Sequence, residues 1–391
     1  MSKWKDYRIK DICCDIGSGT TPKSTNARFY DNGTYCWLNT GDLNDALVFQ
    51  SSQHITDAAL AAYPSLKKYP KDTIIVAMYG ATIGKVGLLT FDSYVNQACC
   101  AMVINKTIAN PLFVLYYLLT YKPQLVKESF GGTQPNVNQF KVATIRIAIP
   151  PLEEQGRIVS YLNDKTGKID ARVSLLSKKR NAYQRLKKAL ISRVVTKGLN
   201  PNAKFKPSGV DWIGEIPEGW EVLHFKRNLS FNNGRDYKHI EVDEGYPVIG
   251  SGGAFANASE YLYDGEALLL GRKGTIDRPL YINGKFWTVD TMFYAVPNRK
   301  TCCKYMYYQA STAPLARYST NTALPSMTQT SLQNLLMCFP PLPEQQSIAS
   351  YLDEKCSEID ANIANLEKQI EKYKELKRAL ISEVVTGKRR V

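Results

Sequence analysis

The chain has 391 residues, of which 44% are hydrophobic, and its 50 lysine and arginine residues against 36 aspartate and glutamate residues leave a formal net charge of +14. The length favours two or three domains, and the longest apolar stretch, near residues 111–120, is far too short to cross a membrane. The first ten residues, MSKWKDYRIK, have no apolar run behind their charges, as an export signal would. We therefore expect a soluble, cytoplasmic protein, with polyanions as the first partners to consider.

Residues 1–148 have the mixed pattern of a globular block. The runs DTIIVAMYG (72–80) and ATIRIAIP (143–150) are typical of strands. Between the two runs, GATIGKV (80–86) is similar to a phosphate-binding loop, but three residues separate its glycines where that loop has four, and Val86 follows the lysine. The spacing therefore does not support nucleotide binding.

Residues 149–198 predict one long helix. Pro150 and Pro151 suit a helix start, with Glu153 and Glu154 complementing the helix dipole, and Gly198 stands where helices commonly stop. Apolar residues recur at spacings of three and four. They are Ile169, Val173, Leu176, Tyr183, Leu190 and Val194, with Arg180 and Lys187 in the breaks. Such a heptad pattern predicts a coiled-coil seam of about 30 residues, roughly 45 Å long.

A polar linker, residues 199–218, leads to a second globular block at 219–338. Strand-like runs in this block are YPVIGSGG (246–253), EALLLGRKG (266–274) and WTVDTMFYAV (287–296). The two blocks end alike, since GGTQPNVNQF (131–140) aligns with NTALPSMTQT (321–330) at an offset of 190 residues. The alignment predicts two related blocks.

A second long helix, within residues 339–391, repeats the first at the same offset. PPLEEQGRIVSYL (150–162) becomes PPLPEQQSIASYL (340–352), and 25 of the 47 residues from Pro150 to Thr196 are identical in the two copies. The second seam consists of Ile359, Ile363, Leu366, Ile370, Tyr373, Lys377, Leu380 and Val384. We predict an α+β protein in which two mixed α/β blocks are separated by two long helices that form an antiparallel coiled coil, with a pseudo-twofold internal repeat.

The basic excess is concentrated in the first helix. Residues 164–197 hold 11 basic and 2 acidic residues, whereas residues 354–387 hold 6 basic and 7 acidic residues. The basic surface of the first helix therefore suits a protein partner as well as DNA.

Cysteine and histidine offer no metal site. Six of the nine cysteines form adjacent pairs, no C-x-x-C spacing occurs, and the three histidines lie far apart, so four convergent zinc ligands are not expected. Small buried thiols in a reducing compartment are the simpler interpretation. Zinc-protease, dinucleotide and adenine-methyltransferase patterns are also missing, which favours a chain without catalysis of its own.

The chain resembles the specificity subunit of type I restriction–modification systems. The resemblance rests on the two helix openings, on the helix ends ALISRVVTKG and ALISEVVTGK, on the linker SGVDWIGEIPEGWEV (208–222), and on WLNTGDL (37–43) and YGATIGKVG (79–87) within the first block. In the second block it rests on GRDYKHIEVDEGYPVIGSGG (234–253) and LLLGRKGTI (268–276). The resemblance implies two target-recognition domains, residues 1–148 and 219–338, each reading one half of a bipartite DNA site.

The same resemblance implies that catalysis belongs to other subunits. Two methyltransferase subunits and, through the complex, restriction subunits are the expected protein partners, and S-adenosylmethionine, ATP and Mg²⁺ are expected on those partners. We assign partner contact to the helix openings and to the basic helix face. The residues are Glu154, Gln155, Lys178, Lys179, Arg180, Glu344 and Gln345.

Candidate DNA-contacting residues are polar or basic and lie near glycine-rich turns, because arginine pairs with guanine and asparagine or glutamine with adenine in the major groove. In the first block they are Thr20, Thr21, Lys23, Arg28, Tyr79, Thr82 and Lys85. In the second block Arg272 and Lys273 lead, followed by Arg235, Lys238, Ser251 and Arg278. Two alternatives stay open: a stand-alone DNA-binding regulator, and a nuclease or methyltransferase whose catalytic site is not recognised.

Overall fold

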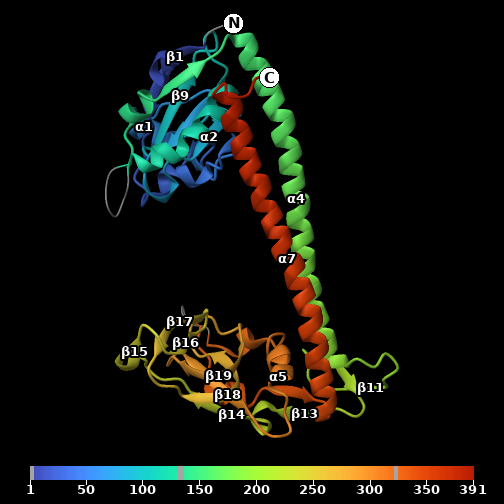
Figure 1. Cartoon of the computed structure of the whole chain (residues 1–391). Helices are drawn as coiled ribbons and strands as arrows, with labels where there is room; N and C mark the ends of the chain where they lie inside the picture. Colours follow the sequence, from blue (N-terminus) through green and yellow to red (C-terminus); the bar gives the residue numbers. More distant parts are fainter. Residues whose placement is uncertain (1–3, 130–135, 321–324) are drawn as a thin grey trace. The chain divides into compact units, whose positions relative to one another are not determined.

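A computed structural model describes residues 4–129, 136–320 and 325–391 (Figure 1). Contacts divide the chain into two compact units: unit 1 is Met1–Leu175 with Gln369–Val391, and unit 2 is Leu176–Lys368. Each unit therefore combines one globular block with the start of the helix that follows it and the end of the other helix. Parts of the aligned block ends, residues 131–135 and 321–324, lie outside the described residues.

The described residues of unit 1 form three sheets. A five-stranded sheet has the order β2 (Cys13–Ser18), β9 (Cys99–Ile104), β6 (Thr73–Ala77), β7 (Val86–Leu89) and β4 (Ala46–Val48). A three-stranded sheet has the order β5 (Gln53–Ile55), β3 (Tyr35–Leu38) and β8 (Tyr94–Val95), and β1 (Lys5–Arg8) pairs antiparallel with β10 (Arg146–Ile149). The helices of the block are α1 (Asp57–Ala62), α2 (Pro111–Lys127) and α3 (Gln139–Ala143). Both predicted strands of the block are present, as β6 and β10.

Unit 2 is built around one seven-stranded sheet. Its order is β14 (Leu229–Asn233), β20 (Met292–Pro297), β18 (Tyr263–Gly271), β19 (Leu280–Thr288), β16 (Tyr246–Gly250), β17 (Gly253–Ala258) and β15 (Glu241–Val242). Two short ribbons pair β11 (Phe205–Pro207) with β12 (Glu215–Pro217) and β13 (Glu221–His224) with β21 (Leu336–Phe339). The helices are α5 (Cys303–Ala310) and α6 (Gln329–Gln333). The apolar run 287–296 spans two strands, because a turn at Val289–Met292 separates β19 from β20.

The two long helices are α4 (Leu152–Lys197) and α7 (Leu342–Val385), with 46 and 44 residues. They are longer than the 30 or so residues expected from the seam, because the repeated openings form the first helical turns. The helices run in opposite directions in each unit (Figure 1). The seam residues that are buried are Ile169, Leu176, Val194, Ile359, Leu366, Ile370, Leu380 and Val384. The predicted antiparallel helix pair is confirmed.

The lysines that interrupt the seam pair with aspartates of the opposite helix. In unit 2, Lys187 Nζ lies 2.6 Å from a carboxylate oxygen of Asp360, and in unit 1, Lys377 Nζ lies 2.7 Å from Asp170. The two pairs are equivalent under the 190-residue offset. Since all four side chains are partly exposed, each pair is worth at most about 1 kcal/mol, and its main effect is to favour one helix register.

Each long helix is fixed to its block by a buried glutamine. Gln155 accepts a hydrogen bond from the backbone N–H of Asn110 at 2.7 Å and donates to the carbonyls of Ile108 and Pro150. Gln345 accepts from Cys302 N–H at 2.9 Å and donates to the carbonyls of Lys300 and Pro340. The two side chains therefore satisfy backbone groups that the start of the helix buries.

A tryptophan joins the two helix ends within each unit. Trp4 Nε1 donates to Glu154 at 3.2 Å in unit 1, and Trp220 Nε1 donates to Glu344 at 3.0 Å in unit 2. Gly198, which follows α4, has φ of +71°, and a Cβ there would lie 3.2 Å from the Trp220 ring. Glycine therefore suits both the left-handed backbone and the close approach.

The nine cysteines are free thiols, and Cys99, Cys100, Cys303, Cys338 and Cys356 are buried. Burial raises the pKa of Cys100, Cys303 and Cys338 to about 12. Cys14, in contrast, is exposed. Among the described residues, no three His, Cys, Asp or Glu side chains gather as a metal site would require, and no helix is long and apolar enough to span a bilayer.

The glutamine contacts generate the first prediction. Gln155→Ala and Gln345→Ala should each lower the free energy of unfolding by about 1–3 kcal/mol, because buried backbone groups lose their partners. Hydrogen exchange read by mass spectrometry should accelerate in unit 1 for Gln155→Ala and in unit 2 for Gln345→Ala. Gln346→Ala, at an exposed neighbouring position, is the matched control. Equal acceleration in both units after either change would contradict separate anchoring.

The burial of the thiols generates the second prediction. At pH 8 the raised pKa values leave Cys100, Cys303 and Cys338 almost entirely protonated, and only the thiolate reacts with iodoacetamide. Peptide mapping should find Cys14 alkylated first and these three thiols only after denaturation. Cys14→Ser should remove the fast phase. Fast labelling of Cys338 in the native protein would show that its surroundings open readily.

Candidate nucleic-acid interface

In each unit, one set of backbone contacts supports a glycine-containing loop. We call this set of contacts the backbone frame. In unit 1 the N–H of Val137 donates to the carbonyl of Met78 at 2.8 Å, and in unit 2 the N–H of Met327 donates to Arg272 at 2.8 Å. The next residues form isolated β-bridges, Tyr79 with Asn136 and Lys273 with Ser326. The loop after β6 and the loop after β18 are thus docked in the same way onto the segment before the following short helix.

A second shared contact fixes that segment to the edge strand. Gln139 Nε2 donates to the carbonyl of Ile16 at 3.2 Å, and Gln329 Nε2 donates to the carbonyl of Phe231 at 3.1 Å. The N-caps also correspond, since Asn138 accepts from Lys141 N–H and Thr328 accepts from Ser331 N–H. These contacts explain why the two blocks end in similar sequences.

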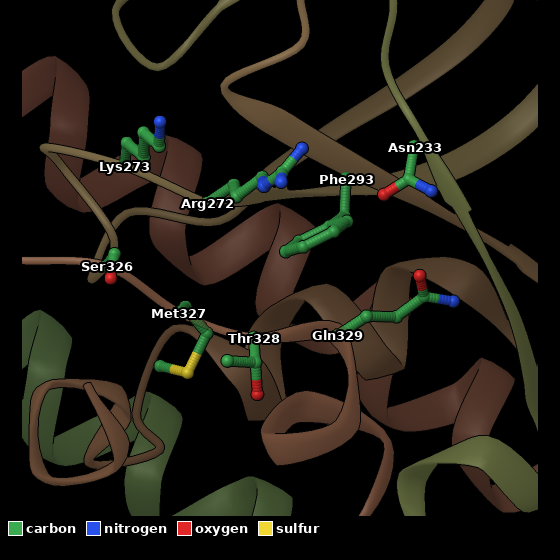
Figure 2. Close-up of a pocket in the computed structure, with 8 residues that line it drawn as sticks. All are labelled: Asn233, Arg272, Lys273, Phe293, Ser326, Met327, Thr328 and Gln329. Carbon is green, nitrogen blue, oxygen red and sulfur yellow. The ribbon is translucent and has the colours of Figure 1, made fainter. Parts of the chain in front are cut away.

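In unit 2 this frame encloses a surface pocket of about 350 Å³. Its lining residues are Asn233, Arg272, Lys273, Phe293, Ser326, Met327, Thr328 and Gln329 (Figure 2). They come from β14, β20, the loop after β18 and the segment leading into α6. Six of the eight are polar or charged, so the pocket suits a polar ligand with a flat face.

Arg272 is held at this pocket by three contacts. Its backbone N–H donates to the carbonyl of Thr291 at 2.8 Å, its guanidinium lies 5.9 Å from the centre of the Phe293 ring, and Nη1 approaches the carbonyl of Asp290 at 3.4 Å. A cation over an aromatic face is stabilised by the quadrupole of the ring. The exposed guanidinium is therefore oriented, with hydrogen-bond donors still free for a ligand.

The structure brings only part of the predicted set in unit 2 together. Arg272 and Lys273 line the pocket, and Figure 2 shows Lys273 on the opposite side of Arg272 from Asn233. The other predicted residues lie elsewhere on the described surface of the unit. Arg235 and Lys238 are exposed after β14, Ser251 follows β16, and Arg278 is exposed between β18 and β19.

In unit 1, Tyr79, Thr82 and Lys85 share one loop. The Thr82 hydroxyl donates to the carbonyl of Tyr79 at 3.1 Å, and the N–H of Lys85 donates to the carbonyl of Thr82 at 2.9 Å. The Tyr79 side chain is 48% exposed. The loop that follows β6 therefore presents these three residues together.

The remaining candidates of unit 1 follow β2. The Thr20 hydroxyl donates a hydrogen bond to the carbonyl of Ser65, and the Thr21 hydroxyl accepts one from the N–H of Gln97. The next residue, Ala98, accepts a hydrogen bond from the N–H of Met78, which precedes Tyr79. Lys23 and Arg28 are exposed further along the same segment. Residues 96–98 therefore connect the two candidate groups.

Sequence reasoning missed several pocket residues. They are Asn233, Phe293, Ser326, Met327, Thr328 and Gln329. The aligned block ends at 131–140 and 321–330 were a usable signal for the last four. No local pattern indicated Asn233 or Phe293, which reach the pocket through strand pairing.

The predicted partner-contact residues differ in exposure. Lys178 and Lys179 are exposed on α4, and Arg180 is half-buried beside Asn181. Glu154 and Glu344 accept from the two tryptophans. Gln155 and Gln345 are only 0% and 2% exposed, and their hydrogen bonds lie within their own units, which argues against direct contact with another subunit. The repeated helix openings did not indicate that the two glutamine side chains are buried.

Comparisons with known proteins agree across both units. The profile of the family described as "Type I restriction modification DNA specificity domain" matches residues 1–178 and 217–372. The type I restriction enzyme MjaVIII specificity subunit of Methanocaldococcus jannaschii is 27% identical over 310 residues, which are 71% of this chain and 70% of that protein. The type I restriction enzyme EcoprrI specificity subunit of Escherichia coli is 23% identical over 358 residues, 87% of this chain and 84% of its own length.

A solved structure supports the fold. It is described as "Structural basis underlying complex assembly and conformational transition of the type I R-M system", and one of its chains matches with a TM-score of 0.73 and 17% identity, over 98% of this chain and 97% of that chain. At this identity the likeness concerns the fold alone. Because the family profile covers most of both units, the chain belongs to the family of type I restriction modification DNA specificity domains.

Proposed function

We propose that this chain is the DNA-specificity subunit of a type I restriction–modification complex and that each unit reads one half of a bipartite DNA site. The observation that carries the proposal is that the family profile matches both units. Both units also use one backbone frame to present a loop with different side chains. A shared frame with different side chains suits two different half-sites.

The proposed DNA-contacting residues are those at or beside the two loops. Arg272 and Lys273 are the leading candidates in unit 2, and Tyr79, Thr82 and Lys85 are the leading candidates in unit 1. Most protein–DNA hydrogen bonds reach phosphates and sugars, so we assign the basic residues farther from the loops to contacts with the sugar–phosphate backbone of DNA. They are Lys23, Arg28, Arg235, Lys238 and Arg278.

We assign methylation and cleavage to partner subunits. Two methyltransferase subunits would dock on equivalent surfaces, and restriction subunits would join through the complex. Equivalent docking is supported by the repeated contacts and by Leu186 and Leu376, which occupy matching positions on α4 and α7 and are each 53% exposed. The paired helices would set the gap between the half-sites.

The partner subunits would also carry S-adenosylmethionine, ATP and Mg²⁺, and the assembled complex would act in the cytoplasm. The family match favours neither a stand-alone regulator nor a self-contained nuclease or methyltransferase.

The central test exchanges one recognition block. Residues 1–148 are replaced by the corresponding block of another family member, and the chimera is co-expressed with the partner subunits. We expect one half of the methylated sequence to change and the other half to stay the same, because each unit has its own core and loops. Methylation-aware sequencing of cellular DNA reads the outcome. A change in both halves would contradict independent reading by the two units.

A second test concerns the basic face of α4. Neutralising Lys178, Lys179 and Arg180 together to glutamine should weaken assembly with the methyltransferase subunits and leave sequence preference intact in the complex that still forms. Size-exclusion chromatography measures assembly. Neutralising Lys204, Lys206 and Lys388, three exposed lysines outside the two long helices, removes the same charge and is the matched control. Full assembly with a smaller salt slope of DNA binding would instead make the α4 face a DNA contact.

A further inference from the structure

We propose that Asn233 and Arg272 form a purine-reading pair in unit 2 and that unit 1 has no counterpart of this pair, so that it reads its half-site with other positions. The inference rests on the proposed function and adds which side chains determine one half of the target. It follows from a position-by-position comparison of the two frames.

Strand register makes the comparison possible. In unit 2, Phe293 of β20 pairs with Asn233 of β14 on one side and with Leu270 of β18 on the other. In unit 1, Cys100 of β9 pairs with Ser18 of β2 and with Val76 of β6. Arg272 follows Leu270 by two residues, as Met78 follows Val76. Ser18, Met78 and Cys100 therefore take the places of Asn233, Arg272 and Phe293.

Backbone hydrogen bonds confirm the match at the loop. Met78 donates its N–H to Ala98 and accepts from Val137, whereas Arg272 donates to Thr291 and accepts from Met327, all at 2.8 Å. The two main chains thus follow the same path. The differences between the units lie in the side chains that this path carries.

The side chains of unit 2 suit base edges. Figure 2 shows the Phe293 side chain between the guanidinium of Arg272 and the amide of Asn233, and the guanidinium lies 5.9 Å from the centre of the Phe293 ring. Gln329 also lines the pocket, but its Nε2 is used by the carbonyl of Phe231. Asn233 is exposed, and no hydrogen bond ties its amide to another residue in the described part of the chain. Both Asn233 and Arg272 therefore retain free hydrogen-bonding groups.

The ligand follows from this chemistry. An arginine fork matches the O6 and N7 acceptors of guanine, and an asparagine amide matches the N7 acceptor and N6 donor of adenine. A phosphate would be served by any cation and would gain little from a neutral amide that is both donor and acceptor. A guanidinium held over a ring beside a free amide thus points to a guanine contacted by Arg272 and an adenine contacted by Asn233.

Unit 1 cannot make these contacts at the same positions. Met78 is 3% exposed and has no hydrogen-bond donor, and Cys100 is fully buried. The short hydroxyl of Ser18 replaces the amide of Asn233. Tyr79, the residue after Met78, is 48% exposed, so the reading of the half-site of unit 1 shifts toward the loop that Tyr79 begins.

The test uses the full chain assembled with its partner subunits. Arg272→Ala, Arg272→Lys, Asn233→Ala and the control Arg299→Ala, an exposed arginine of the same unit after β20, are compared with wild type by methylation-aware sequencing. We expect Arg272→Ala and Asn233→Ala each to relax one purine position, with discrimination falling roughly 5- to 150-fold. Arg272→Lys should relax the same guanine, because lysine keeps the charge and loses the fork. Arg299→Ala should leave the sequence unchanged.

The relaxed positions must lie in the half-site that survives exchange of residues 1–148, and that half-site must contain a guanine and an adenine. Methylation of the unaltered other half in each variant shows that the variant is folded and assembled. Two outcomes would overturn this inference and leave the proposed function intact. In the first, Arg272→Ala and Asn233→Ala methylate the same DNA sequence as wild type. In the second, Arg272→Lys behaves as wild type while Arg272→Ala weakens methylation of all DNA sequences alike. A wild-type complex that methylates no defined sequence would overturn the proposed function together with it.

Discussion

The antiparallel pairing of α4 and α7 is the constraint on which the rest of the structure depends. Each unit completes its core with the start of one helix and the end of the other. Ile158 and Leu162 share a core with Val384 and Val385 in unit 1, and Ile348 and Leu352 share one with Val194 and Val195 in unit 2. Burial of such side chains contributes about 1.5–3 kcal/mol each, whereas the exposed lysine–aspartate pairs contribute at most about 1 kcal/mol. Apolar packing therefore holds the helices together, and the ion pairs favour their register.

Stability and recognition are assigned to different atoms of the same loops. Backbone hydrogen bonds and the glutamines Gln139 and Gln329 hold the loop frame in both units with the same geometry. The side chains that project from this frame differ, as Met78 and Arg272 do. A site of this kind can change its specificity without loss of folding, since the residues that read a ligand are not those that satisfy the buried backbone.

The positive charge of the chain is likewise divided among several tasks. Lys187 and Lys377 are used between the helices, where each meets an aspartate. Lys178 and Lys179 on α4 are exposed, and in our proposal they contact partner subunits while the basic residues near the two loops contact DNA. A net charge of +14 therefore does not measure the size of a DNA-binding surface.

The sequence by itself determined the elements whose pattern is local or repeated. The 190-residue offset, the heptad seams, the proline-marked helix starts and the strands β6 and β10 could all be predicted, because periodicity and turn residues act over a few neighbours. Arg272 and Lys273 could be singled out from their glycine-rich turn. Only the tertiary structure decided that Gln155 and Gln345 are buried anchors and that Asn233 and Phe293 lie at the same pocket as Arg272. The physical reason is that strand pairing joins residues that are about 20 to 60 positions apart, and which strands pair is decided by packing of the whole sheet rather than by any local pattern.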